Sequence, residues 1–169
     1  MRGSDNSPEV TGAQIGTLIA IVQIRSGINR SRETVHALKL LRLERVHTAS
    51  LIRSSLSLNG QMMKVKDVAC WGPIEKGTLI QLLIKRGRLV GDRRLSESEL
   101  KRYTGYLSVE ALAEDLLLNK VELADVKGLK PFFRLMSPGL RTSRKRAGSD
   151  RGLLGNLGKR INEVLMKML

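Results

Sequence analysis

The chain contains little sulfur and few aromatic side chains. Cysteine occurs once in 169 residues, and aromatic residues make up 3% of the composition. With Cys70 alone, neither an intrachain disulfide nor a site of several thiolates can form. Only His36 and His47 offer imidazole. We therefore expect no disulfide scaffold, no zinc site and no cofactor.

The shortage of aromatic residues also limits how the chain can bind RNA. A sheet that stacks bases needs exposed Phe or Tyr at neighbouring strand positions. The strand-like segments at 18–25 and 48–53 contain neither, and Trp71 stands alone. If the chain binds RNA, we expect it to do so mainly through backbone charge and shape.

The sequence gives no support for a membrane or secreted protein, or for an enzyme. No apolar run reaches the length of a membrane span, and no cleavable signal precedes residue 18. The sequence also has no phosphate-cradling glycine loop, no nucleophile elbow and no His-Glu-x-x-His motif. We expect a soluble, cytoplasmic protein that is not an enzyme, with no membrane partner and no small-molecule substrate.

Positive charge is the dominant feature of the composition. Lysine and arginine number 30 against 16 acidic residues, which leaves a formal charge of +14 and a pI of about 10.6. A field of one sign and this size is neutralised by a polyanion. Nucleic acid is the first candidate and an acidic membrane surface the second.

Residues 17–73 show the pattern of a compact α+β unit. Apolar runs at 18–25, 48–53 and 68–71 predict strands, and periodic apolar positions at 34–41 and 58–65 predict helices, the first of which Ser31 can cap. The pattern predicts a ferredoxin-like split βαβ core, in which two helices cover a small antiparallel sheet. Residues 1–16 are polar and without period, and we expect a flexible tail.

The remainder predicts a mostly helical extension at 74–138, followed by a basic arm and a closing helix at 139–169. Helices are expected within 73–87, after the cap Ser96 and after the cap Ser108, with a hairpin or an extended loop at 88–95 and a brief strand at 132–136. Residues 139–159 are basic and glycine-rich, so we expect a disordered loop, an arm that orders against phosphates, or both. The acidic patch Glu110, Glu114 and Asp115 is expected to face away from phosphate.

Basic side chains around the first helix form a stripe opposite its apolar face. Such a stripe is often only a solvated surface, but the large positive excess favours contact with RNA. The candidate RNA-binding residues are Arg25, Arg30, Arg32, Lys39, Arg42, Arg45, His47, Arg53, Lys64 and Lys66 in the core, Arg86, Arg88 and Arg134 in the extension, and Arg141, Arg144, Lys145, Arg146 and Arg151 in the arm.

Several blocks resemble one known family. They are Arg25-Ser26-Gly27, Lys64-Val65-Lys66-Asp67 with Trp71-Gly72, Gly128-Leu129-Lys130-Pro131 and Phe133-Arg134-Leu135. The chain resembles the large-subunit ribosomal proteins called L-thirty in bacteria and archaea and L-seven in eukaryotes, in their longer archaeal-type form. It departs from the family pattern at Ser55-Leu56, Gly60-Gln61 and Gly139-Leu140-Arg141.

The resemblance implies a structural protein of the large ribosomal subunit that binds large-subunit rRNA and acts in translation. It also implies closeness to the small rRNA of that subunit and to neighbouring ribosomal proteins. A free RNA-binding regulator or a ribosome assembly factor with the same fold is the alternative.

Cys70 is predicted to be structural, because a lone cysteine in a strand is most often a small buried hydrophobe. Cys70→Ala should retain RNA binding and lower the free energy of unfolding by about 1 kcal/mol. Denaturant titration and RNA-binding isotherms measure the two effects. Selective loss of an activity in a folded variant would contradict a structural role.

Overall fold

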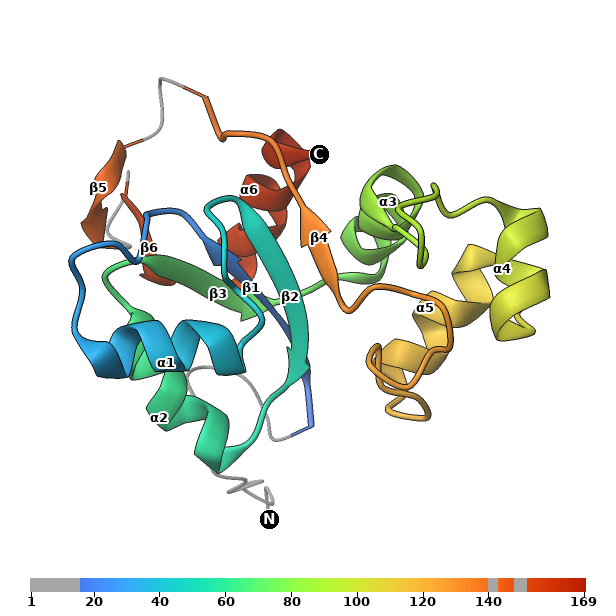
Figure 1. The fold of residues 1–169 in the computed structure, drawn as a ribbon, viewed down its shortest axis with the longest axis horizontal. Helices are drawn as coiled ribbons and strands as arrows, with labels where there is room; N and C mark the ends of the chain where they lie inside the picture. Colours follow the sequence, from blue (N-terminus) through green and yellow to red (C-terminus); the bar gives the residue numbers. More distant parts are fainter. Residues whose placement is uncertain (1–15, 140–142, 148–151) are drawn as a thin grey trace, which may run out of the picture.

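The computed structural model describes residues 16–139, 143–147 and 152–169 (Figure 1). The strands are β1 (Leu18–Gln23), β2 (Thr48–Arg53), β3 (Ala69–Pro73), β4 (Phe132–Arg134), β5 (Ser143–Ala147) and β6 (Gly152–Asn156). The helices are α1 (Arg32–Leu40), α2 (Leu56–Val65), α3 (Lys76–Arg86), α4 (Glu97–Thr104), α5 (Val109–Leu117) and α6 (Ile161–Met168), the last preceded by the 3-10 turn η1 (Gly158–Arg160). None of the helices in the described part of the chain is long and apolar enough to cross a membrane.

Strand β1 is buried along its whole length. Its side chains alternate between two hydrophobic clusters: Ala20 and Val22 belong to one, and Ile19 and Ile21 to the other. Alternation is inherent in a strand, so a strand that is apolar at every position needs a covering layer on both faces. The run at 18–24, apolar at every position except Gln23, therefore predicts a buried strand, and β1 is one.

Helices α1 and α2 cover one face of the sheet. Leu38 and Leu41 from the first helical segment pack with Met62 and Val65 from the second, against Ile21 of β1. The other face carries α6, and α3 and α5 pack next to it, since Leu82, Leu112 and Leu165 are buried in the same cluster as Ala20 and Val22. Figure 1 shows α1 and α2 together on one side of the strands, α6 on the other, and α4 and α5 beside the sheet.

The strand order is β4-β2-β1-β3-β6-β5. β1 pairs antiparallel with both β2 and β3, with Ala20 opposite Leu51 and Ile21 opposite Trp71. β4 continues the antiparallel pairing on β2, whereas β6 is parallel to β3. The predicted α+β fold with a two-helix antiparallel core is confirmed, and the parallel β6 makes the complete sheet mixed.

The expectation of a disordered loop at 139–159 is wrong for residues 152–157, which are ordered in the chain alone. Gly155 pairs with Cys70 of β3, and Leu153, Leu154 and Leu157 are buried in the core. Three leucines are too few to show a period, and β3 lies too far away in the sequence to reveal the pairing. Of the arm residues, Arg144, Lys145 and Arg146 lie on β5, whereas Arg141 and Arg151 lie outside the described residues.

Serine caps begin four helices. Oγ of Ser31, Ser55, Ser96 and Ser108 accepts a hydrogen bond from the backbone N–H three residues later, at 3.1–3.4 Å. A serine oxygen satisfies one of the N–H groups that a helix leaves unpaired at its start. The predicted caps Ser31, Ser96 and Ser108 are confirmed, and Ser55 is a further one.

The hairpin expected at 88–95 is also present, because Leu89 N–H donates to Arg93 O at 2.9 Å.

Cys70 lies on β3 and is fully buried. Burial raises the pKa of its thiol to about 12, so the reactive thiolate is not formed near neutral pH. The prediction that this cysteine is structural agrees with its position.

Two glycines offer a matched test of the packing. A Cβ on Gly72 of β3 would lie 2.1 Å from the carbonyl oxygen of Gly158, whereas one on Gly60 of α2 would meet nothing within 4 Å. Gly72→Ala should lower the free energy of unfolding by about 2–3 kcal/mol, because η1 must move away from β3. Gly60→Ala should raise it by about 0.5–1 kcal/mol through helix propensity.

Urea unfolding followed through the fluorescence of the buried Trp71 measures both changes. An unchanged midpoint for Gly72→Ala would contradict the close approach of η1 to the sheet.

Candidate nucleic-acid interface

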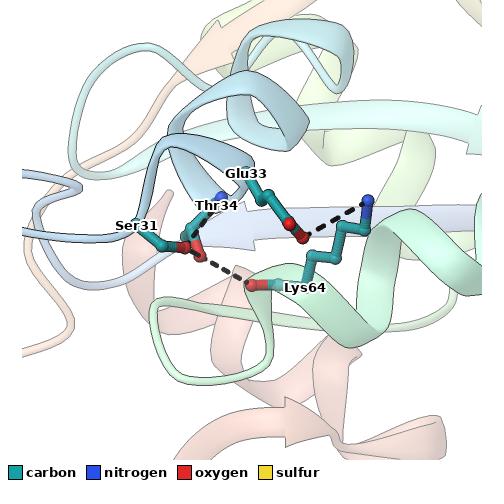
Figure 2. Close-up of polar contacts among 4 residues, drawn as sticks. All are labelled: Ser31, Glu33, Thr34 and Lys64. Atoms are coloured by element: carbon teal, nitrogen blue, oxygen red, sulfur yellow. Dashed lines mark hydrogen bonds and ion pairs between the residues drawn. The ribbon is translucent and has the colours of Figure 1, made fainter.

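Helix α1 is fixed at its N-terminus to the end of α2 (Figure 2). The Thr34 hydroxyl donates to the Lys64 carbonyl oxygen at 3.2 Å, and Lys64 Nζ lies 3.7 Å from Glu33 Oε2. Ser31 Oγ accepts from the backbone N–H of Thr34 at 3.3 Å. The exposed Lys64–Glu33 pair is worth little by itself, but the hydrogen bonds orient α1 relative to the sheet.

The outward face of α1 is basic. Ala37 and Leu38 face the core, so Arg32, His36 and Lys39 project from the opposite side, and all three are exposed. Arg30, in the turn before the helix, is exposed as well. The predicted stripe is therefore a continuous surface on a rigid helix.

A left-handed residue ends α1. The N–H of Leu43 donates to Leu38 O at 2.8 Å, and the N–H of Arg42 donates to Lys39 O at 3.0 Å. These two bonds form a Schellman motif, whose left-handed position is usually glycine. Here it is Arg42, with φ +58°. An arginine in this conformation costs stability of about 1 kcal/mol or more, which suggests that its side chain has a role outside the fold.

The loop from α1 to β2 is held at its far end by His47, which is half-buried. Its N–H donates to Gln23 O at 2.8 Å, and its carbonyl oxygen accepts from Leu135 N–H at 2.8 Å. The loop is thus joined to β1 and to the chain after β4, and Arg45 within it is exposed.

Four cations converge on one open hollow beside β4. Lys39 lies in the last turn of α1, Arg42 and Arg45 belong to the following loop, and Arg134 comes from β4. The remaining lining consists of Glu44, Thr48, Pro131 and Phe132. We refer to Lys39, Arg42, Arg45 and Arg134 as the basic cluster. A second groove shares Lys39 and Arg45 and continues to Arg30 at the opposite end of α1.

The charges of the basic cluster are only weakly offset within the chain. Lys39, Arg42 and Arg45 form no ion pair with another described residue. The pKa of Asp92 lies below its ordinary value, mainly because Lys130 donates a hydrogen bond to its carboxylate at 2.7 Å. The nearby charges of Arg134 and Arg88 also favour the charged form of Asp92. The surface is therefore prepared to attract an anion.

Two predicted RNA-binding arginines are instead engaged within the fold. Arg53 Nη2 donates to Val121 O at 2.6 Å and its Nε lies 3.9 Å from Glu122 Oε1, so it joins β2 to the segment after α5. Arg86 Nη2 donates to Leu169 O at 2.7 Å and joins α3 to the end of the chain. Neither residue lines the hollow with the basic cluster.

Three further candidate RNA-binding residues, Arg25, Lys66 and Arg88, do not line the hollow. Arg25 is half-buried in the turn after β1, and its N–H donates to Val68 O at 2.9 Å. The exposed Lys66 stands just before Val68, at the end of α2. Arg88 is half-buried at the base of the hairpin near Asp92.

Four lining residues were not predicted from the sequence: Glu44, Thr48, Pro131 and Phe132. The alternation in Phe132-Phe133-Arg134 was the available signal, because residues two apart in a strand share a face. Phe133 is buried in the core, which turns Phe132 and Arg134 to the opposite side.

The predicted acidic patch is paired within the chain. Glu114 Oε1 lies 2.5 Å from Lys76 Nζ, and Asp115 Oδ1 lies 3.1 Å from Lys120 Nζ. Tyr106 also donates to Asp115 Oδ2 at 3.1 Å. Within the described ranges, no three His, Cys, Asp or Glu side chains are grouped so that they would hold a metal ion.

The fold and this surface define a class: a basic α+β protein that presents rigidly placed cations, as proteins that bind folded RNA do. Residues 19–68 match the family model described as ribosomal protein L30p/L7e. The large ribosomal subunit protein uL30 of Thermofilum pendens is 40% identical over 155 residues, which cover 90% of this chain and 99% of that protein.

The uL30 proteins of two other organisms give the same result. That of Korarchaeum cryptofilum is 40% identical over 154 residues, covering 90% of this chain and 95% of its own length. That of Caldivirga maquilingensis is 37% identical over 179 residues, covering 95% and 96%. The chain belongs to the L30p/L7e family of ribosomal proteins, and the resemblance seen in its blocks is confirmed.

The left-handed Arg42 separates stability from binding. Arg42→Gly should raise the free energy of unfolding by about 1 kcal/mol, because glycine adopts positive φ without strain. The same change should weaken RNA binding, because a cation of the hollow is lost. Urea titration and binding isotherms on rRNA measure the two effects.

Arg42→Ala is the matched control, since it removes the same guanidinium but keeps a Cβ in the left-handed conformation. It should lose as much affinity as Arg42→Gly without the gain in stability. If Arg42→Gly is less stable than the original protein, the arginine side chain supports the fold and its assignment to RNA is wrong.

Proposed function

We propose that this chain is a structural constituent of the large ribosomal subunit and that it binds large-subunit rRNA through the basic cluster and the outward face of α1. Membership of the family over 90% of the chain carries the first statement. The convergence of four cations on one hollow supports the second. The protein acts in translation, in the cytoplasm, and its role is non-enzymatic.

The physical basis is neutralisation of phosphate by cations that are already in place. Each phosphate contact releases condensed counterions, so affinity falls as the salt concentration rises. Cations on α1, and on a loop held at both ends, need little ordering when they bind. Their fixed spacing fits the phosphates of one folded RNA surface better than those of another, so shape provides the selectivity.

The proposal includes a finer set of contacts. Arg25, Lys64, Lys66 and Arg88 would extend the interface beyond the hollow. The arm residues Arg141, Arg144, Lys145, Arg146 and Arg151 would add further phosphate contacts. The small rRNA of the large subunit and neighbouring ribosomal proteins are further partners, proposed on the family resemblance.

The position of the acidic patch is compatible with the proposed interface. Glu114 and Asp115 lie on α5, which stands with α4 beside the sheet and away from the exposed face of α1 (Figure 1). Their pairing with Lys76 and Lys120 reduces their repulsion of phosphate.

The basic cluster can be tested by neutralising three of its members. The triple variant Lys39→Gln, Arg42→Gln and Arg45→Gln should lose specific binding to large-subunit rRNA. It should also flatten the slope of log affinity against log salt by about 2 to 3, since each lost contact contributes roughly 0.7–0.9. Filter binding across a salt series measures both effects.

The control neutralises three exposed lysines elsewhere: Lys101 on α4, Lys127 in the segment between α5 and β4, and Lys167 on α6. It has the same net charge as the test variant and should keep specific binding. Equal losses in both variants would show that net charge, and not the basic cluster, accounts for the binding.

Sedimentation of tagged protein tests the ribosomal role. The protein should migrate with the large subunit and remain there through a high-salt wash. Protein found mainly outside ribosomal particles would favour the free regulator or assembly factor.

A further inference from the structure

We propose that the hollow beside β4 is a binding site for a single unstacked RNA nucleotide, whose base lies on Phe132 and whose phosphates are held by the basic cluster. The inference rests on the proposed function and adds a base-reading contact to it.

Phe132 is an aromatic residue that lies outside the hydrophobic core. It belongs to neither hydrophobic cluster, whereas its neighbour Phe133 is only 1% exposed. Phe132 lies opposite Ser50 and Arg134 lies opposite Thr48 on the face of the sheet that α1 covers. The half-buried ring therefore lines an open hollow at the edge of the sheet, next to the end of α1.

The hollow combines the groups that a nucleotide requires. The Phe132 ring and Pro131 offer an apolar surface on which a base stacks, and all bases have a π-face. Lys39, Arg42, Arg45 and Arg134 surround that surface with donors for phosphate. Glu44, also in the lining, accepts hydrogen bonds from an exocyclic amino group. The site should therefore prefer adenine, cytosine or guanine to uracil.

An unpaired nucleotide fits this arrangement better than a duplex does. In an A-form helix the bases are stacked on each other, and the deep major groove keeps their edges from side chains. A ring in a hollow that is also lined by four cations is reached only by a base that leaves the stack. A protein segment would need several acidic residues to balance the cluster, whereas the phosphates of RNA carry that charge at every step.

The site is built before it binds. The Schellman bonds hold Arg42 in its left-handed conformation, and the backbone of His47 is bonded to Gln23 and Leu135. β4 is joined to β2 through three residue pairs. The aromatic ring and the cations thus come from segments with fixed relative positions, which lowers the entropy lost on binding.

The test compares Phe132→Leu with Phe132→Tyr in the full chain, using a whole large-subunit rRNA transcript as the probe. Leucine keeps an apolar group but removes the π-face, so the affinity should fall roughly 5- to 150-fold. Tyrosine should bind within about twofold of the original protein. The salt slope should stay the same in both, because no phosphate contact is removed. Tyr103→Leu, at an exposed aromatic on α4, is the control and should change nothing.

Ultraviolet cross-linking of large subunits that contain the protein, followed by mass spectrometry, identifies the occupant. A cross-link from Phe132 to an unpaired nucleotide would support the proposal, with an A, C or G expected. A cross-link to a neighbouring protein would overturn it.

The remaining outcomes separate this inference from the proposed function. If Phe132→Leu binds as well as the original protein while the triple glutamine variant is impaired, the nucleotide site is wrong and the phosphate interface stands. If the original protein shows no preference for rRNA over a fully paired duplex, the proposed function itself fails. Thermal unfolding of each variant confirms that the fold is intact.

Discussion

The burial of β1 on both faces is the constraint on which the remaining architecture depends. Successive side chains of this strand enter different clusters, so a single layer of helices leaves half of them in water. α1 and α2 cover one face, and α6 covers the other, where α3 and α5 extend the same hydrophobic cluster beside the sheet. The family model spans 19–68, which includes the first layer only. The segments after residue 73 complete the core, and they also add β4 and β6 to its two sides.

Completion of the sheet by β4 also creates the proposed interface. Lys39, Arg42 and Arg45 are near one another in the sequence, but Arg134 and Phe132 reach them only because β4 pairs with β2. Four like charges around one hollow repel each other, and the left-handed Arg42 adds backbone strain. Both effects reduce the stability of the isolated chain. In the proposed complex, RNA phosphate would relieve this repulsion, and the strain in the free protein would keep the cations in position for binding.

The distribution of negative charge complements this surface. On α5, Glu114 and Asp115 form ion pairs with lysines of the same chain. Glu33 is close to Lys64, and Glu122 to Arg53. None of these carboxylates lines the hollow with the basic cluster, so they do not offset its charge there. Such asymmetry orients a protein as it approaches a polyanion and raises the rate of productive encounters.

The sequence alone determined the features that depend on neighbouring residues. The apolar run at 18–25, the helical period at 34–41 and the caps Ser31, Ser96 and Ser108 each lie within one segment, and the structure agrees with them. Only the tertiary structure decided that β6 pairs with β3, that Arg53 and Arg86 are bonded to carbonyl oxygens of the fold, and that Phe132 opens onto the basic cluster. These features arise from contacts between residues far apart in the chain. Periodicity and propensity describe one segment at a time and carry no information about which distant segment will lie beside it.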